Sequence, residues 1–194
     1  MSHFLLRGFS ALAVWLLLAD SSFAVRYFEG DSECFYDLSD SPANAPRFED
    51  YPVRVVPIKK PHAVDFKGNR EAWRFRTVLR DGAPDGPNFA GHYTFVHHGC
   101  GSSCDAVFIV DALTGHAERP KTYEAVSTVY TNDIDKSGHQ YRIDSSLIAV
   151  VGAPNEDDDR EGISYLNWDG RGLKLLRFVS KADICKAHPN PNKK

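Results

Sequence analysis

Residues 87–104 hold the densest group of side chains that could do chemistry. The stretch begins with Pro-Asn-Phe-Ala-Gly-His-Tyr and ends with His-His-Gly-Cys-Gly-Ser-Ser-Cys. A histidine close to a cysteine can draw off the thiol proton, which is the basis of thiol catalysis. Two cysteines four positions apart can instead form a disulfide, whose sulfur atoms are no longer nucleophiles. The disulfide is favoured if the chain is exported to an oxidising compartment.

The alternation of a β-strand sorts the histidines of this stretch onto two faces. If residues 89–98 are extended, His92 and His98 share one face and His97 lies on the other. We therefore expect His92 to lie near His98 and near the loop that carries Cys100. We predict Asn88, His92 and His98 as binding side chains. Since adjacent histidines on a strand point apart, the three histidines are only a weak signal for a metal site.

His92 is also the candidate base of a hydrolase. A carboxylate would have to orient its imidazole, and Asp105 and Asp111 are the candidates. The signatures of common exported hydrolases (Gly-x-Ser-x-Gly, Ser-x-x-Lys and His-Glu-x-x-His) do not occur in the sequence. This favours a binding protein over an enzyme.

The cysteines predict two disulfides. The chain has four cysteines, namely Cys34, Cys100, Cys104 and Cys185. An even number in an exported protein is typical of disulfide bonding, and four cysteines allow three pairings. The spacing favours a bridge between Cys34 and Cys185 that ties the ends together. Cys100 and Cys104 then close a small local loop.

The central motif resembles that of a family of small exported bacterial proteins that share PNFAGHY followed by GCGxxC. Further similarity lies in FRTVLRDGA at residues 75–83 and in IVDALTG at residues 109–115. The resemblance covers about the middle half of the chain. It implies export and a common fold, and it implies no particular activity.

A second group of oxygen-bearing side chains matches a calcium loop. Asp133, Asp135 and Ser137 stand at its first, third and fifth positions, glycine is at the sixth, and Asp144 is at the twelfth. Alternate residues of such a loop aim oxygens at the ion, while the glycine allows a sharp turn. Calcium is therefore the candidate cofactor. The alternative is an ordinary polar turn between two strands.

The elements that must position these side chains are mainly β-strands. Alternation and turn residues predict strands over residues 51–57, 89–97, 106–111, 141–151, 164–168 and 173–179. The run 107–110 is apolar on both faces, which predicts a strand that is covered on both sides. One helix is predicted over 69–80, because Asn69 can cap its N-terminus. The expected fold is α+β: a mainly antiparallel, strongly curved sheet, like a meander of propeller blades, with one packed helix and stabilising disulfides.

The first 24 residues have the pattern of a secretory signal peptide. Arg7 precedes the apolar run at residues 11–19, and Ser-Phe-Ala at 22–24 fits a cleavage site. We expect cleavage after Ala24 and a location in the periplasm or outside the cell. The rest is predicted to comprise an extended arm (25–47), a single globular β-rich domain (48–185) and a flexible tail (186–194).

Charge and hydropathy narrow the class of partner. The net charge is −3, and residues 1–24 contribute one arginine and one aspartate, so their removal leaves it unchanged. Nucleic acids select strongly basic surfaces, so we expect no nucleic-acid partner. Beyond the signal pattern, no apolar run reaches the roughly 20 residues that span a bilayer, so we expect no membrane span.

These features favour an exported, non-enzymatic binding protein. We expect a protein partner in the envelope or outside the cell, with the chain acting as an inhibitor or immunity-type protein against an envelope-directed enzyme. One alternative is a periplasmic hydrolase that uses His92 with a nearby carboxylate. The other is a structural calcium-binding protein of the envelope.

Overall fold

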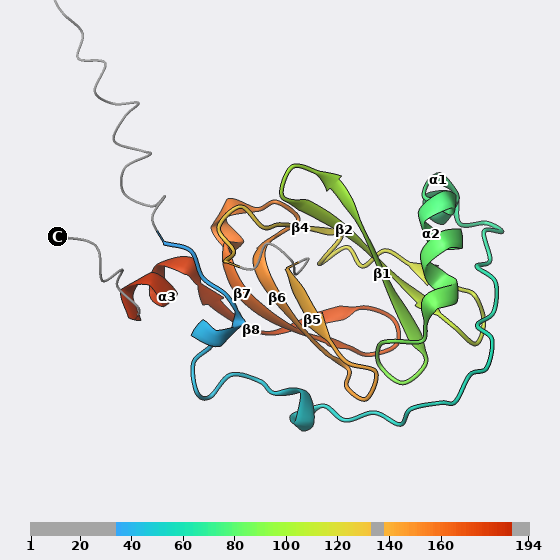
Figure 1. Cartoon of the computed structure of the whole chain (residues 1–194), viewed down its shortest axis with the longest axis horizontal. Helices are drawn as coiled ribbons and strands as arrows, with labels where there is room; N and C mark the ends of the chain where they lie inside the picture. The colour runs from blue at the N-terminus through green and yellow to red at the C-terminus, as the bar shows by residue number, and fades with distance from the viewer. Residues whose placement is uncertain (1–33, 133–137, 188–194) are drawn as a thin grey trace, which may run out of the picture. The chain divides into compact units, whose positions relative to one another are not determined.

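An open antiparallel sheet forms the centre of the structure, which is a computed structural model describing residues 34–132 and 138–187 (Figure 1). The strands follow the path β1-β2-β4-β6-β7-β8, with β3 paired to β2 and β5 paired to β6. Their bounds are β1 Tyr93–Gly101, β2 Cys104–Asp111, β3 Ala117–Glu118, β4 Ala125–Ser127, β5 His139–Tyr141, β6 Leu147–Pro154, β7 Gly162–Trp168 and β8 Leu173–Ser180. The predicted antiparallel meander is confirmed. The predicted strong curvature is not, because the path ends at β1 and β8 without closing and the sheet is not strongly curled.

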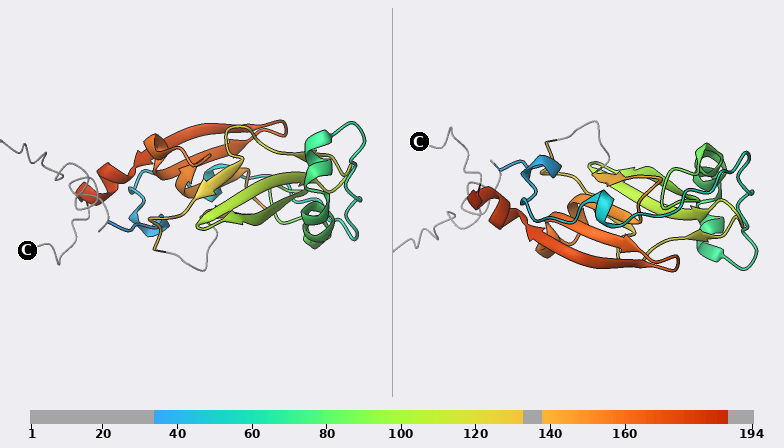
Figure 2. Two further views of the ribbon diagram at one scale, coloured as in Figure 1. Left: turned by 90° about the horizontal axis from the view of Figure 1, so that it is seen from above. Right: turned by 90° about the horizontal axis from the view of Figure 1, so that it is seen from below.

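Short helices lie at the two ends of the molecule (Figures 1 and 2). The α-helices are α1 Arg70–Arg74, α2 Arg76–Gly82 and α3 Lys181–Ala187, and 3-10 turns span Leu38–Asp40, Phe48–Asp50, Ala83–Asp85 and Asp158–Arg160. Asn69 caps α1 as predicted, since its Oδ1 accepts a hydrogen bond of 2.9 Å from the Ala72 N–H. The single predicted helix is broken at Phe75, whose backbone leaves the helical region (φ −102°, ψ 20°). Helix α3 was not predicted.

Two of the predicted strands are wrong. Residues 51–57 form no strand, and only Pro52 makes an isolated bridge, to Ser145. Prolines 52 and 57 cannot donate to a ladder, which explains the failure. Residues 141–151 are divided between β5 and β6, because the chain reverses at 142–146 and His139 comes to pair with Val150.

The core lies on both faces of the β1–β2 hairpin. Phe95, Val107 and Ile109 pack into one buried cluster, whereas Val96 and Phe108 pack into another, beneath α2. This separation follows the strand alternation. The prediction that residues 107–110 are covered on both sides is confirmed.

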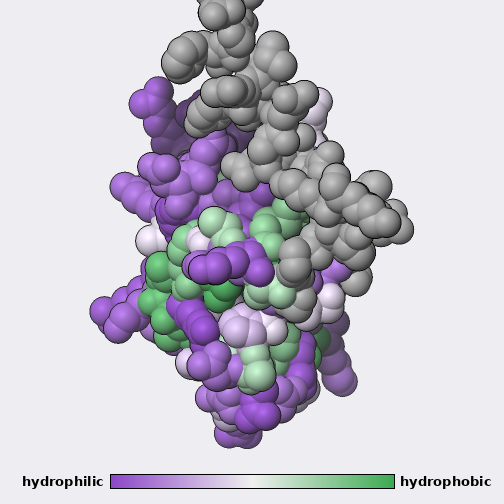
Figure 3. All heavy atoms as spheres, turned by 90° about the vertical axis from the view of Figure 1, so that its left-hand side faces the viewer, coloured by the Kyte–Doolittle hydropathy of each residue, from purple (hydrophilic) through white to green (hydrophobic). Residues whose placement is uncertain are grey.

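Both predicted disulfides are present, linking Cys34 to Cys185 and Cys100 to Cys104. The first ties the arm to α3, and the second closes the end of the β1–β2 hairpin. Next to Cys34, the side chain of Tyr36 is completely buried, and its hydroxyl donates to Glu161. The arm therefore packs against the sheet from Tyr36 onward. The end of the molecule at which α3 lies exposes both hydrophobic and hydrophilic residues (Figure 3).

None of the described helices is long and apolar enough to cross a membrane.

Removing the long disulfide should destabilise the fold more than removing the short one. The bridged residues are separated by 151 positions in one case and by 4 in the other. The loss of chain entropy in the unfolded state predicts a cost of about 5 kcal/mol for the double variant Cys34→Ser/Cys185→Ser, against about 2 kcal/mol for Cys100→Ser/Cys104→Ser. Guanidinium unfolding of the two variants tests this, and equal losses would contradict the assignment of overall stability to the long bridge.

Candidate metal centre

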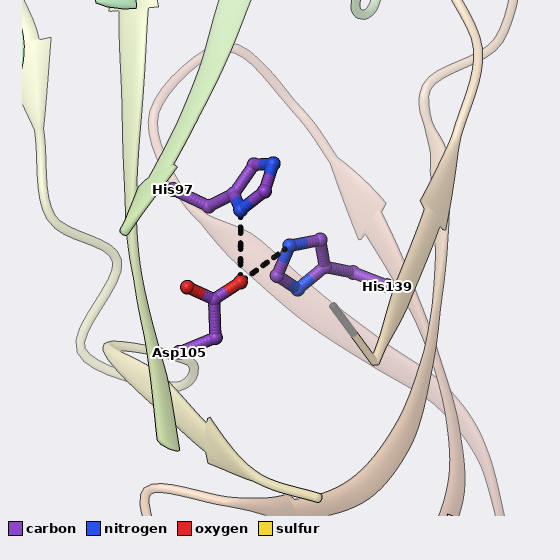
Figure 4. Close-up of side chains that lie close together, drawn as sticks. All are labelled: His97, Asp105 and His139. Atoms are coloured by element: carbon purple, nitrogen blue, oxygen red, sulfur yellow. Dashed lines mark hydrogen bonds and ion pairs between the residues drawn. The ribbon is translucent and has the colours of Figure 1, made fainter. Parts of the chain in front are cut away.

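Three side chains from three strands converge beneath the β1–β2 hairpin (Figure 4). They are His97 of β1, Asp105 of β2 and His139 of β5, and one donor atom from each lies within 4.8 Å of the others. Asp105 Oδ2 is 2.8 Å from His97 Nδ1 and 3.2 Å from His139 Nε2. Two imidazole nitrogens therefore face a single carboxylate oxygen.

The register of β1 and β2 places the first two of these side chains. Gly99 lies opposite Asp105 and His97 lies opposite Val107. Positions 97 and 99 share a face, so His97 and Asp105 are diagonal neighbours on that face, within reach of each other. The Cys100–Cys104 disulfide closes the hairpin just beyond them. The ladder and the bridge together hold this pair in place.

Gly138 brings the third side chain into position at the start of β5. Its φ is +74°, and a Cβ there would lie 2.6 Å from Thr128 Cγ2 and 2.9 Å from the Val151 carbonyl oxygen. A larger residue would therefore be strained and would clash. The His139 ring then lies 4.7 Å from the His97 ring and 4.9 Å from the Phe95 ring, between centroids.

His139 is completely buried, and its two ring nitrogens have different surroundings. Nδ1 lies 2.7 Å from the hydroxyl of Tyr123. Burial raises the pKa of Tyr123 well above its ordinary value, so the phenol keeps its proton. Burial also lowers the pKa of His139, which favours the neutral imidazole. Nε2 faces Asp105 but makes no well-aligned hydrogen bond to any described residue, so a buried polar atom is left unsatisfied.

Asp105 supplies the negative charge of the site. Burial would raise the pKa of its carboxyl, but the imidazoles of His139 and His97 outweigh this and hold the pKa at about 2. The carboxylate is therefore ionised at neutral pH. The His97 side chain is 39% exposed, so the group can be reached from solvent.

The donor set suits a divalent transition metal. Imidazole nitrogen and carboxylate oxygen are ligands of zinc, copper, nickel and iron. The unsatisfied Nε2 of His139 is where such an ion would bind, beside Nδ1 of His97 and Oδ2 of Asp105. A ligating histidine usually has a hydrogen-bond partner at its other nitrogen, and Tyr123 provides one for His139. His97, Asp105 and His139 therefore fit a divalent transition-metal ion.

The structure separates the predicted hydrolase residues. His92 Nε2 lies 3.9 Å from Asp111 Oδ1, so that pair is brought together. Asp105 lies further along the hairpin with His97 and His139, so the pairing of His92 with Asp105 is wrong. His92 lies in the turn before β1, so the strand alternation expected for residues 89–98 does not apply to it.

The expected proximity of His92 to the cysteine loop is also wrong. Cys100 is seven residues along β1 from Tyr93, the next residue after His92, which corresponds to about 23 Å. Both sulfur atoms of that loop are in a disulfide. The thiol-nucleophile alternative therefore fails.

Asn88 and His98, which were predicted as binding residues, make contacts that stabilise the fold. Asn88 Oδ1 accepts a 2.7 Å hydrogen bond from the Phe95 N–H and so completes the edge of β1. The His98 ring packs 5.4 Å from the Phe75 ring, on the opposite face from His97. Burial lowers the pKa of His98. Neither side chain joins the metal centre.

The predicted calcium ligands Asp133, Asp135 and Ser137 lie outside the described residues. The fourth, Asp144, is exposed and receives two hydrogen bonds from the Arg142 guanidinium, of 2.9 and 2.7 Å. An ion at Asp144 would have to compete with this pair. Calcium binding stays a prediction.

The sequence analysis missed His97, His139 and Tyr123 as functional residues. Counting back from a hairpin closed by Cys100 and Cys104 would have placed His97 near Asp105. No local pattern connects His139 to them, because β5 reaches the hairpin only through its pairing with β6.

No protein family model, no curated protein and no solved structure matches this chain. The interpretation of the site therefore depends on its own geometry.

Tyr123→Phe should destabilise the protein by about 1–3 kcal/mol, because it leaves His139 Nδ1 buried without a hydrogen bond. Tyr141→Phe is the matched control, since Tyr141 is a half-buried tyrosine whose hydroxyl makes no hydrogen bond within the described part of the chain. Urea unfolding in the presence of a chelator measures both. A loss of the same size in the control would show that the phenol of Tyr123 has no special role.

Asp105 should make the stability of the metal-free protein depend on pH. Its folded pKa of about 2 lies below the unfolded value of 3.8. Its contribution is therefore present above about pH 4 and is lost as the pH falls towards 2. Asp105→Asn should remove about 2 kcal/mol of that change, whereas the exposed Asp81→Asn should not. Chemical unfolding from pH 4.5 down to about 2.5, with a chelator present, measures the slope, and an unchanged slope in Asp105→Asn would refute the expectation.

Proposed function

We propose that this chain is an exported, non-enzymatic binding protein whose ligand is a divalent transition-metal ion held by His97, Asp105 and His139. One observation carries the proposal. Three donor atoms lie within 4.8 Å of one another, and one of them, His139 Nε2, is buried without a hydrogen bond in the described structure. A bound cation would satisfy that nitrogen and the carboxylate together.

The chemistry of the donors selects the class of ion. Calcium and magnesium are hard ions that prefer oxygen ligands, whereas two imidazoles favour zinc and its neighbours in the first transition row. The carboxylate and two neutral imidazoles carry one negative charge, so a divalent cation leaves the site with a charge of +1. A charge of +1 costs less free energy to bury than the charge of +2 that an ion with neutral ligands alone would keep.

The shell around the donors supports binding in a defined orientation. When a metal occupies Nε2 of His139, the ring proton must be at Nδ1, from which it can be donated to the Tyr123 oxygen. The rings of Phe95 and Tyr141 lie 4.4 Å apart beside the site. They limit the access of water from the core side. The imidazole of His139 thus needs little reorganisation to bind.

The number of donors supports reversible binding. Structural zinc sites are closed by four protein ligands, whereas sites with three keep a position for water or another ligand. The described residues offer three, and His97 lies at the solvent edge. An ion could enter and leave there without unfolding of the hairpin.

Export is part of the proposal. It is supported by the signal pattern of residues 1–24 and by the two disulfides, which persist in oxidising compartments. Action as an inhibitor stays a prediction, because no described feature selects a protein partner. The hydrolase alternative has only the His92–Asp111 pair, whose 3.9 Å separation is too long for a hydrogen bond.

Zinc should bind the purified, chelator-treated protein with one ion per chain. His97→Ala should weaken zinc binding by at least about 10-fold, because it removes one of the three ligands. His97 lies at the solvent edge of the site, so its loss should leave the fold intact. His116→Ala is the matched control, since its side chain is 68% exposed and lies outside the cluster. Isothermal titration with zinc chloride gives the affinity and the stoichiometry.

A thermal scan provides the independent readout. Zinc should raise the melting temperature of the wild-type protein and of His116→Ala by mass action, and it should have little effect on His97→Ala. If His97→Ala binds zinc as tightly as the wild type, or if His116→Ala loses binding instead, the proposed site is refuted.

A further inference from the structure

A second hollow lies at the other end of the β1–β2 hairpin, where Tyr93 pairs with Asp111. Its volume is about 210 Å³, and its walls combine rings and charged groups from four separate strands and turns. The groups that matter are Tyr93, Trp168, Asp111, His116, Glu118 and Arg171. His97 is four residues along β1 from Tyr93, or about 13 Å. This hollow is therefore distinct from the metal centre.

Two aromatic rings form the apolar wall. Tyr93 and Trp168 meet edge to face, with centroids 5.4 Å apart, and the His92 ring packs 4.2 Å from the Tyr93 ring. The orientation of Tyr93 is therefore fixed from two sides. A rigid ring of this kind can contact the C–H groups of a ligand at little entropic cost.

Trp168 is buried at the base of this wall. The residue is only 5% exposed, and its indole nitrogen is buried without a well-aligned hydrogen bond to any described residue. The Tyr93 ring lies beside the indole; burial raises the pKa of Tyr93, and the indole N–H opposes that rise. Since Trp168 lines the hollow beside Tyr93, its indole resonance can report a ligand that binds there.

The polar wall offers both donors and acceptors. Asp111 and Glu118 are carboxylates that accept hydrogen bonds. His116 Nε2 lies 3.7 Å from Glu118 Oε2. Arg171 comes from the turn between β7 and β8. That turn is held by Asp169, whose Oδ1 accepts from the N–H groups of Arg171 and Gly172 at 2.9 and 3.0 Å. Arg171 is thus placed at the rim by a defined turn.

We propose that this hollow binds one neutral sugar ring, either free or at the end of a glycan. A sugar has an apolar face for the rings of Tyr93 and Trp168. Its hydroxyls can donate to Asp111 and Glu118 and accept from Arg171. The volume equals that of roughly seven liquid waters and is below the roughly 300 Å³ of pockets for drug-sized ligands. It suits a single ring.

The mixed charges argue against charged ligands. A cationic amine would meet Arg171 in the same wall, and an anion would meet Asp111 and Glu118. A neutral ligand with many hydroxyls can form hydrogen bonds with all of these groups and places no like charge against any of them. Sugar binding does not depend on the metal proposed above, so each proposal can fail without the other.

The indole N–H of Trp168 gives a direct test by NMR. The ¹⁵N-labelled protein without residues 1–24, in the presence of a chelator, is titrated separately with glucose, galactose, mannose and N-acetylglucosamine. At least one sugar should shift the Trp168 indole resonance with a dissociation constant on the order of 10⁻³ M, as expected for so small a ligand. The indole of Trp73, which is 51% exposed on α1, should not move.

Two variants and a control assign the effect to the hollow. Glu118→Gln and Arg171→Ala should each weaken the binding of that sugar by about 5-fold or more, the loss of a typical hydrogen bond to a charged group. The exposed Glu156→Gln should not. The proposal is overturned if no sugar shifts the Trp168 resonance, if glycerol or choline shifts it as strongly, or if both site variants keep wild-type affinity.

Discussion

Strand β1 is hydrogen-bonded to β2 in antiparallel register, from Tyr93 opposite Asp111 to Gly101 opposite Cys104. A slip of one residue would turn His97 to the opposite face and away from Asp105. Two features oppose such a slip. Phe95 and Val96 are committed to different buried clusters, and the Cys100–Cys104 bridge closes the end of the hairpin. The geometry of both proposed sites depends on this one pairing, because each uses side chains from both strands.

The candidate metal centre is a polar group in an aromatic core, and such groups are costly unless they are satisfied. Asp105 is partly compensated by two imidazoles, and His139 by the Tyr123 hydroxyl at Nδ1. Nε2 of His139 stays without a hydrogen bond in the described structure. A site that keeps an unsatisfied buried nitrogen gives up stability in the empty state. The proposed ion would satisfy this nitrogen and so recover that stability when it binds.

The two sites share the hairpin but differ in how they are built. The candidate metal centre is assembled from strand residues whose backbone is held by ladders, which suits the narrow geometry that an ion requires. The aromatic hollow takes Arg171 and His116 from turns at its rim, and its rigid part is the Tyr93–Trp168 pair. A rigid ring with adaptable polar groups around it suits a ligand with many hydroxyls. Both sites are compatible with an exported chain that binds small ligands and is kept intact by disulfides.

The sequence by itself determined the features that depend on near neighbours: the antiparallel meander, the strand over residues 107–110 covered on both faces, the Asn69 cap and the Cys100–Cys104 disulfide, which leaves Cys34 and Cys185 to pair with each other. These follow from alternation, turn chemistry and spacing, which are local. The tertiary structure alone decided that His139 and Tyr123 meet Asp105, and that Trp168 meets Tyr93. Such contacts depend on the pairing of β5 with β6 and on the position of β7 in the sheet. His92 was misplaced for a related reason: it lies in the turn before β1, where strand alternation does not apply, and its neighbours depend on the register with β2, which no local pattern specifies.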